Sequence, residues 1–424
     1  MPHRKSLCGL DLDKKWLIYE LETHRVHFTI KEIILKNFCR KKSMTSDDQN
    51  IQKVRKLPLQ YDIALLFPVL FLVGIGIVMV YSASSTLALK KFGTSYYFLK
   101  KQSIFALLGI VALVVSYHIP YRTFRSLTYP LLILTFIFLI AILVSGFGYS
   151  AGGATRWFRV EGFTFQPSEL ARFALVIYLA YSMNKKKDRI KEFKVGFLPH
   201  ILLLGMFTVL IILQPDFGSV VILGAITWIM LFIGGVRISY LLGSLAVATP
   251  IVYYLMVSAD YRIERLICFL NPWQYSADKG YQIVHSLLAF GTGGIWGTGI
   301  GGGYQKLFYL PEPHTDFIFS VIGEELGLLG VLIILGFYTL ILWRGVSIAR
   351  NSKDVFGSLV AIGLTTAMGL QVCINMGVAL GLLPTKGLTL PFLSYGGTSL
   401  LINMVSIGLL MNIGASKRMP KNKS

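Results

Sequence analysis

The stretch Leu310-Pro-Glu-Pro-His-Thr-Asp-Phe-Ile-Phe-Ser-Val-Ile-Gly-Glu-Glu-Leu-Gly327 places ionisable side chains at the start of, and inside, a long apolar run. Three of them are the carboxylates Asp316, Glu324 and Glu325, and a fourth is His314. An unpaired charge inside a membrane costs on the order of 3 kcal/mol or more, so this pattern requires a functional reason. The stretch predicts chemistry at a membrane surface, with Asp316 at its centre.

Apolar runs of about 20 residues recur along the chain, which is 54% hydrophobic with a mean hydropathy of +0.62. Such runs match the thickness of a bilayer core, and a helix of that length satisfies its own backbone groups in lipid. The sequence therefore predicts an all-α polytopic membrane protein with ten transmembrane helices and a long outer loop, residues 258–316, between the seventh and the eighth. The expected helices are roughly 63–82, 101–117, 127–145, 168–183, 197–213, 219–235, 239–257, 317–343, 356–380 and 396–414.

The net charge of +20 is distributed unevenly between the two sides of the predicted helices. Of the 41 Lys and Arg residues, 29 fall on the side of the termini, 11 fall on the other side, and Arg172 falls within a helix. Lys and Arg concentrate in the cytoplasmic loops of membrane proteins, so both termini are expected in the cytoplasm. The charge is a topology signal and does not indicate binding to nucleic acid.

The polar ends of the chain lie outside the predicted ten-helix domain, residues 57–416. Residues 1–56 are either a cytoplasmic extension, partly disordered, or the product of a start codon placed too far upstream, because Met44 precedes a short polar leader. Residues 417–424 form a short basic cytoplasmic tail. The four cysteines show neither a metal-binding spacing nor a plausible disulfide pair.

Unusual polar residues gather at the predicted outer ends of the helices. Gln166-Pro-Ser-Glu and Gln214-Pro-Asp open two helices, where proline and a capping carboxylate suit the first turn. Asp216 is thus either a helix start alone or part of an outer polar site. Glu169 and Arg172 are three residues apart and share a helix face, so they can pair inside the bundle. That pair is either structural or part of the wall of a polar cavity.

Arg156 and Arg159 lie in a predicted Gly-rich outer loop, with Trp157 and Phe158 between them. Basic and aromatic residues at this depth are often plain anchors at the membrane interface. Guanidinium groups also bind pyrophosphate or an anionic lipid head group through bidentate contacts. Both interpretations stay open from the residues alone.

The long outer loop carries the stretch Gly291-Thr-Gly-Gly-Ile-Trp-Gly-Thr-Gly-Ile-Gly-Gly-Gly303. No strand precedes it, which excludes a dinucleotide-binding motif, and its glycines are expected to permit tight turns and close backbone approach. Asp316 ends the loop. It is either the N-cap of the next helix, a role that Thr315 could also fill, or a general base tuned by the helix end and the lipid. Of Glu324 and Glu325, one is expected to pair with a cation and the other to face the cavity.

Several stretches in the same order resemble the SEDS (shape, elongation, division and sporulation) family of membrane glycosyltransferases across residues 61–414. The chain is most similar to the cell-division branch, FtsW, rather than to the elongation branch, RodA, because Thr385-Lys-Gly-Leu-Thr389 is typical of division and sporulation proteins. The matching stretches are Tyr81-Ser-Ala-Ser-Ser, Gly153-Ala-Thr-Arg-Trp-Phe, Gln166-Pro-Ser-Glu, Gln214-Pro-Asp-Phe-Gly, Phe269-Leu-Asn-Pro-Trp, Gly280-Tyr-Gln, Gln305-Lys-Leu-Phe-Tyr-Leu-Pro-Glu, His314-Thr-Asp-Phe-Ile-Phe, Gly323-Glu-Glu-Leu-Gly and Leu383-Pro-Thr-Lys-Gly-Leu-Thr-Leu-Pro-Phe-Leu-Ser-Tyr-Gly-Gly.

The resemblance implies a peptidoglycan glycosyltransferase that polymerises lipid II on the outer face of the bacterial cytoplasmic membrane, at the division septum. Its inverting transfer requires a base for the attacking hydroxyl and stabilisation of the leaving pyrophosphate. Asp316 is the expected catalytic base. The expected substrate-binding residues are Arg156, Arg172 and Lys386 for phosphate, Glu169 to hold Arg172, His314 to orient Asp316 or the substrate, and also Gln305 and Asp216.

The resemblance also implies partners and leaves one cofactor open. The expected partners are lipid II, the growing undecaprenyl-diphosphate glycan chain, a class B penicillin-binding protein and other membrane proteins of the divisome. Whether a divalent cation, Mg²⁺ or Mn²⁺, takes part stays open. A lipid II flippase is the main alternative, since a polar cavity among helices suits transport as well, and a structural scaffold is a third. The clustering of polar motifs on one side favours the enzyme.

Overall fold

The computed structural model describes residues 61–144, 148–151, 154–160, 163–258, 260–276, 280–307 and 310–416. The predicted extension 1–56 and tail 417–424 lie outside these residues. The described helices are α3 (Ile63–Phe92), α4 (Tyr97–His118), α5 (Thr123–Val144), α6 (Pro167–Lys185), α7 (Leu198–Ile212), α8 (Phe217–Ile233), α9 (Ile238–Val257), α10 (Asp260–Leu270), α11 (Tyr281–Gly293), α12 (Ile318–Arg350), α13 (Val355–Ala379) and α14 (Gly397–Ser416), with short turns η1 (Lys187–Arg189) and η2 (Phe193–Phe197).

Eight of the described helices are long and apolar enough to cross a membrane, by length and composition. Two more helices occupy ranges that the sequence predicted as spans: α8 is apolar but has 17 residues, and α6 carries Glu169 and Arg172 within its 19 residues. The prediction of a polytopic helical membrane protein is therefore confirmed. The number of ten spans and the cytoplasmic position of the termini stay predictions.

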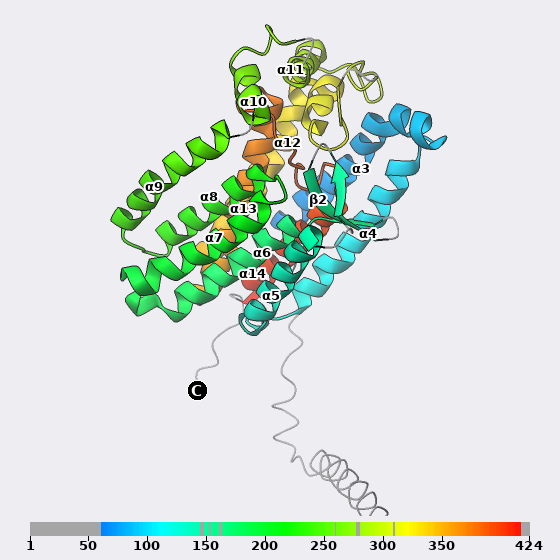
Figure 1. Cartoon of the computed structure of the whole chain (residues 1–424). Helices are drawn as coiled ribbons and strands as arrows, with labels where there is room; N and C mark the ends of the chain where they lie inside the picture. Colours follow the sequence, from blue (N-terminus) through cyan, green and yellow to red (C-terminus); the bar gives the residue numbers. More distant parts are fainter. Residues whose placement is uncertain are drawn as a thin grey trace, which may run out of the picture. The chain divides into compact units, whose positions relative to one another are not determined.

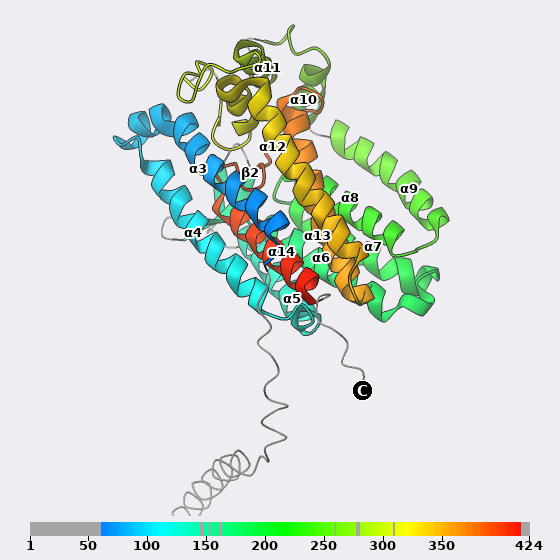
Figure 2. The ribbon, with the colours of Figure 1, turned by 180° about the vertical axis from the view of Figure 1, so that it is seen from behind.

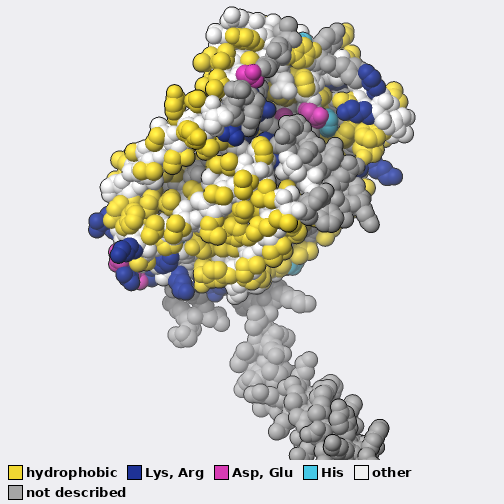
Figure 3. Space-filling model, viewed as in Figure 1, with side chains coloured by type: hydrophobic (Ala, Val, Ile, Leu, Met, Phe, Trp, Pro, Cys, Tyr) yellow, Lys and Arg dark blue, Asp and Glu magenta, His cyan; other side chains and the backbone are white. Residues whose placement is uncertain are grey.

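Buried and exposed helices differ sharply within the bundle. The central helix α6 buries 15 of its 19 residues, and it packs against α5, α8 and α13. In the peripheral helix α9, only 6% of the most apolar stretch of 18 residues is buried. The main neighbours of α9 are α8 and α10 (Figures 1 and 2). Hydrophobic side chains cover much of the flank of the bundle, while charged ones lie mainly toward its ends (Figure 3). An apolar surface of this extent suits contact with lipid.

The prediction of an all-α fold is wrong for the segment between α5 and α6. Strands β1 (Gly148–Ala151), β2 (Ala154–Val160) and β3 (Phe163–Phe165) form an antiparallel sheet in the order β1-β2-β3. The segment that was expected to be a Gly-rich loop is rich in Thr, Trp, Phe and Val, which favour strands. Arg156 therefore projects from a strand, and β2 packs against α5 and α6.

The long outer segment 258–316 also contains regular structure, because α10 and α11 lie within it. In Figure 1 these two helices and the start of α12 lie at one end of the bundle, with β2 close by. The glycine-rich stretch after α11 makes the tight turns that the sequence predicted, with positive φ angles at Gly294, Gly297, Gly299 and Gly301. The described part of this segment is thus folded beside the N-terminal end of α12 and is not an open loop.

The long helix α12 is broken at Gly327, where φ is 63° and ψ is −166°. The carbonyl oxygens of Glu324 and Glu325 accept hydrogen bonds from the backbone N–H groups of Thr298 and Gly299, both at 3.0 Å. Beyond the break, the N–H groups of Leu328 and Leu329 donate to Gly294 O and Ile295 O at 3.0 and 3.2 Å. The glycine-rich stretch therefore satisfies the backbone groups that the break leaves free.

Candidate active site

Asp316 lies just outside α12, and it does not cap the helix. The N-cap position is Phe317, which has no side-chain cap, and the Thr315 hydroxyl donates to Glu312 O at 3.2 Å instead. Both capping interpretations are therefore wrong. In the described part of the chain, no hydrogen bond or ion pair reaches the Asp316 carboxylate. The Asp316 backbone is held, because Asn375 Nδ2 donates to its carbonyl oxygen at 3.0 Å.

The environment of Asp316 favours a proton on its carboxylate. Burial, followed by the nearby charge of Glu312, raises the pKa of Asp316 to about 7, while Arg156 and Arg265 act in the opposite direction. A carboxyl group that titrates near neutral pH can both accept and release a proton at that pH. Gly387 lies against it: a Cβ atom on Gly387 would be 2.9 Å from Asp316 Oδ2. The absence of a side chain there leaves the carboxylate room.

Lys386 is the neighbour of Gly387 and the most unusual cation of the site. Its side chain passes so close to Gly218, in the first turn of α8, that a Cβ atom on Gly218 would overlap it. Its Nζ atom is buried and has no hydrogen-bond partner among the residues that the structure describes. Burial lowers the pKa of Lys386 to about 8, although the charge of Asp216 opposes this. A buried ammonium group without a partner is suited to bind an anion.

Arg156 and Asp216 complete the charged group around Lys386. Arg156 Nη1 lies 3.8 Å from Asp216 Oδ1, and its guanidinium also donates to Pro215 O. Asp216 caps α8, because it accepts from Ser219 N at 3.2 Å and from Ser219 Oγ at 2.5 Å. Asp216 thus starts a helix and also contacts a cation, so it is not a helix start alone, and its part in an outer polar site stays a prediction.

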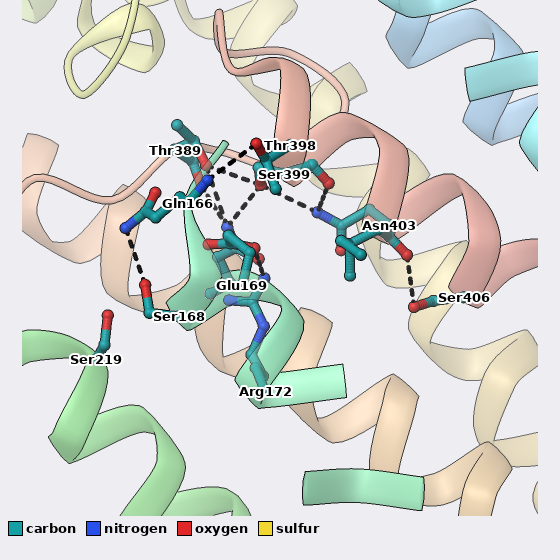
Figure 4. A network of polar contacts seen from close by, with 12 residues as sticks. Gln166, Ser168, Glu169, Arg172, Ser219, Thr389, Thr398, Ser399, Asn403 and Ser406 are labelled. Atoms are coloured by element: carbon teal, nitrogen blue, oxygen red, sulfur yellow. Dashed lines mark hydrogen bonds and ion pairs between the residues drawn. The ribbon is translucent and has the colours of Figure 1, made fainter. Parts of the chain in front are cut away.

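The predicted pair of Glu169 and Arg172 is present and buried in the first turns of α6. It belongs to a network of polar side chains that joins α6 to α14 (Figure 4). Gln166 N donates to Thr398 Oγ1 at 3.2 Å, and Thr398 Oγ1 donates to Thr164 O at 3.1 Å. The charges of Arg172 and Glu169 both act on Lys386, so the pair lies beside the charged group of Lys386, Arg156 and Asp216.

The segment 381–396, which carries Lys386, is held by polar residues that sequence reasoning missed. Gln371 Nε2 donates to Thr389 O at 2.9 Å, and Asn375 Nδ2 donates to Leu388 O. Tyr338 of α12 donates its hydroxyl to Pro391 O. Gln371 and Asn375 are amides four residues apart on one face of an apolar helix, and this spacing was the signal that could have found them.

His314 packs its ring between Phe98 of α4 and Tyr395, with ring centroids 4.5 and 5.6 Å away. Burial, together with the charge of Lys91, lowers the pKa of His314 to about 4, so the ring is neutral at physiological pH. Among the described residues, the His314 ring contacts Phe98, Tyr395 and Glu312 and does not contact the Asp316 carboxylate, while the His314 carbonyl accepts from Tyr395 N at 2.9 Å. Of its two predicted roles, orientation of Asp316 by the ring is not seen, and contact with the substrate stays a prediction.

Gln305 and the two glutamates lie on the side of α11 and the glycine-rich stretch. Gln305 Oε1 is 2.7 Å from His285 Nδ1, and its contacts do not join the charged group around Lys386. Glu325 pairs with Lys306 at 2.6 Å, which confirms the prediction that one glutamate has a cation partner. Glu324 is fully buried and accepts from the backbone N–H groups of Tyr304 and Gln305 at 2.7 and 3.2 Å, so the prediction that it faces a cavity is wrong.

The site thus combines a carboxyl group poised to take a proton with cations that have capacity for an anion. Comparison with known proteins gives a consistent result. Residues 63–419 match the model of the FtsW, RodA and SpoVE family, described as cell cycle proteins. The chain is 46% identical over 354 residues to the probable peptidoglycan glycosyltransferase FtsW of Geobacter metallireducens, covering 84% of this chain and 94% of that protein.

Two further relatives extend this result. The chain is 39% identical over 357 residues to the stage V sporulation protein E of Bacillus subtilis, covering 84% of this chain and 98% of that protein. A solved structure described as "Structural coordination of polymerization and crosslinking by a peptidoglycan synthase complex" contains a chain that superposes with a TM-score of 0.70 at 29% identity, covering 85% of this chain and 99% of that one. The chain therefore belongs to the family of the FtsW, RodA and SpoVE cell cycle proteins.

Proposed function

We propose that the chain polymerises lipid II into glycan strands at the division septum, with Asp316 as the general base. The chain is a peptidoglycan glycosyltransferase, as its relatives of 46% identity are named. The observation that carries the base assignment is that the Asp316 carboxylate has no described partner, and burial raises its pKa to about 7 although Arg156 is nearby.

The proposed reaction is a single inverting displacement. The 4-hydroxyl oxygen of the GlcNAc residue of lipid II attacks the anomeric carbon of the MurNAc residue at the end of the growing chain. Asp316 accepts the hydroxyl proton as the new C–O bond forms. The bond to undecaprenyl pyrophosphate breaks, the pyrophosphate leaves with the electron pair, and the α-linked donor becomes a β-1,4 linkage.

The leaving pyrophosphate gathers negative charge that the site must stabilise. Arg156 supplies positive charge near Asp316, and the buried Nζ of Lys386, the residue before Gly387, has its donors available. Glu169 holds Arg172, whose charge adds to the same field. Gln305 and His314 stay proposed contacts of the substrate, because both precede Asp316 in the segment that leads to α12.

A divalent cation remains part of the proposal as an option. Among the described residues, no group of three or more His, Cys, Asp or Glu side chains could hold a metal ion. Mg²⁺ is often bound by one or two carboxylates together with substrate phosphates, so the substrate pyrophosphate would supply most of its ligands. Polymerisation assayed with and without a chelator tests this requirement.

The proposed setting is the bacterial cytoplasmic membrane. The chain is an integral membrane protein, and we propose ten spans, cytoplasmic termini and an active end that faces outward, because the charge asymmetry and the one-sided site agree. The likeness to a chain of a peptidoglycan synthase complex supports a class B penicillin-binding protein as partner. Other membrane proteins of the divisome are proposed on the FtsW likeness.

The second candidate function is a lipid II flippase, which a polar site inside a helical bundle would also suit. The position of the charged group at one end of the bundle favours the enzyme, since a flippase needs access from both faces. The deciding experiment reconstitutes the full chain with its transpeptidase partner in vesicles that contain lipid II. Glycan strands without accelerated flipping support the polymerase, and accelerated flipping without strands supports the flippase.

A further inference from the structure

Lys306, Glu325 and Ser82 form a buried polar group that the proposed chemistry does not use. Lys306 Nζ is 2.6 Å from Glu325 Oε1 and donates to Ser82 Oγ at 3.0 Å. Ser82 Oγ in turn lies 2.7 and 2.8 Å from the two carboxylate oxygens of Glu325. The side chains of Lys306 and Glu325 are 5% and 0% exposed, so the pair is dehydrated and its geometry is fixed.

The three residues come from three separate elements. Ser82 lies in α3, Lys306 lies in the stretch between α11 and α12, and Glu325 lies in the last turn of α12 before the break at Gly327. The break separates Ile318–Leu326, which follows Asp316 directly, from the long part of α12. The position of this half-helix is therefore not dictated by the rest of α12. It depends on the packing of its buried residues, on the bond from Asn375 to the Asp316 carbonyl oxygen at 3.0 Å, and on what holds its C-terminal end.

The glycine-rich stretch and Lys306 together fix the C-terminal end of the half-helix. Thr298 and Gly299 bond to the backbone of the half-helix, and Glu324 accepts from Tyr304 N and Gln305 N. Lys306 follows directly and adds the only ion pair that the described residues form with the half-helix. Every one of these contacts lies eight or nine residues from Asp316, which is about 13 Å along a helix.

We infer that Lys306 is a positioning residue for the transfer: through Glu325 and Ser82 it fixes the half-helix that aims Asp316 at the acceptor hydroxyl, without touching the substrate. This inference rests on the proposed role of Asp316. A base must lie within hydrogen-bond reach of its proton, and an error of about 1 Å can lower the rate about 10²-fold. The ion pair with Lys306 and the hydrogen bond from Ser82 tie the half-helix to two other elements, and a glycine break alone would leave its orientation less restricted.

The test compares Lys306→Met with Lys306→Arg in the full chain, reconstituted with its transpeptidase partner. In Lys306→Met we expect kcat for lipid II polymerisation to fall about 10- to 100-fold with KM changed less than threefold. Lys306→Arg keeps the charge and should recover most of the rate. The double variant Lys306→Met/Glu325→Gln leaves no unpaired buried charge, so it should fold well and remain slow.

Two readouts separate positioning from simple stability. Hydrogen exchange at the amides of Thr298, Tyr304 and Gln305 should speed up at least tenfold in the double variant, while the amides of α13 keep wild-type protection. The control Arg125→Met breaks the ion pair with Asp354 at the other end of the bundle, and it should lower stability without lowering kcat of the folded protein. Wild-type kcat in folded Lys306→Met, or in the double variant, overturns the inference.

The same set of proteins distinguishes this inference from the proposed function. Asp316→Asn is measured in parallel. Normal turnover by Asp316→Asn removes the base assignment, whereas the hydrogen-exchange result for the Lys306 variants stands by itself. An inactive Asp316→Asn together with a fully active Lys306→Met keeps the base and removes the positioning role.

Discussion

Asp316 and Glu325 lie nine residues apart on one segment, and their surroundings are opposite. Glu325 is fully buried, and its carboxylate oxygens are bound by Lys306 and Ser82. The Asp316 carboxylate has no described partner, and the nearby cation Lys386 is itself unpaired at Nζ. The Glu325 carboxylate is thus fixed by its partners, whereas the half-buried Asp316 carboxylate, whose pKa is raised to about 7, can exchange protons.

This difference shows why a cluster of acidic residues in a membrane segment does not identify the reactive one. All three carboxylates of the segment are equally unusual in sequence. The structure distinguishes them by their partners. Glu324 accepts hydrogen bonds from backbone amides, Glu325 forms an ion pair with a lysine, and the Asp316 carboxylate has no partner among the described residues. The following changes test that separation.

Asp316→Asn should give the largest effect. Asparagine keeps the size of the side chain but cannot accept the proton, and general acid–base groups contribute about 10²–10⁴-fold in rate. We expect lipid II polymerisation to fall by that factor while folding, insertion and partner binding are retained. Because Asp316 does not cap α12, no helix-capping loss accompanies the change. Polymerisation near the wild-type rate would refute the base assignment.

Lys386→Met should follow, with a loss of about 10²-fold in kcat, the size expected for removing one fixed charge from a developing anion. The variant should be at least as stable as the wild type, since it removes a buried ammonium group that has no described partner. The control is Lys100→Met, which removes an exposed lysine of α4. Lower thermal stability with unchanged turnover in Lys386→Met would make Lys386 a structural residue.

The pH dependence of kcat/KM should reveal both groups. A base must be deprotonated, so activity should rise about tenfold per pH unit up to the Asp316 pKa of about 7. It should fall again above the Lys386 pKa of about 8, as the ammonium group loses its charge. The free energy of unfolding should change with pH in the opposite direction to activity. The pKa of Asp316 is higher in the folded than in the unfolded protein, so its stabilising contribution is fully present below about pH 4 and is lost as the pH rises through about 7.

The fall in kcat/KM above about pH 8 gives a sharper test of the role of Lys386. In Lys386→Met that fall should disappear, while the rise assigned to Asp316 remains. Thermal unfolding of Asp316→Asn should lack the destabilisation of the wild type between about pH 4 and pH 7. A profile that is flat between pH 5 and pH 8 would contradict the assignment of both groups.

The sequence predicted the helices well because an apolar run of bilayer length is a local property of the chain. It also predicted the Glu169–Arg172 pair, since a spacing of three on a helix is a local property. The strands around Arg156 pair with one another and contain residues that favour strands, so a local signal was present beside the glycines. The broken α12 could not be predicted, because the break at Gly327 is filled by the 294–299 stretch.

The contacts of Asp316 with Gly387, and of Lys386 with Gly218, were beyond sequence reasoning for a related reason. Each joins segments more than 70 residues apart, and glycine leaves no chemical signal of what approaches it. A substitution at such a glycine is the mildest test of the difference between Asp316 and Glu325, because it changes the space around a reactive group and not the group itself.

Gly387→Ala should give the smallest measurable effect, a loss of about three- to tenfold in kcat. Its Cβ atom would lie 2.9 Å from Asp316 Oδ2, closer than such atoms normally approach, and the carboxylate can turn away because it is the free end of a side chain. Stability should therefore change little while the direction of the base changes. Gly224→Ala is the matched control, since its Cβ atom would meet nothing within 4 Å. Equal rates for the two alanine variants would mean that the space beside Asp316 is not used in the reaction. A much lower yield of folded protein for Gly387→Ala would mean that the Asp316 side chain cannot turn away and is packed as rigidly as that of Glu325.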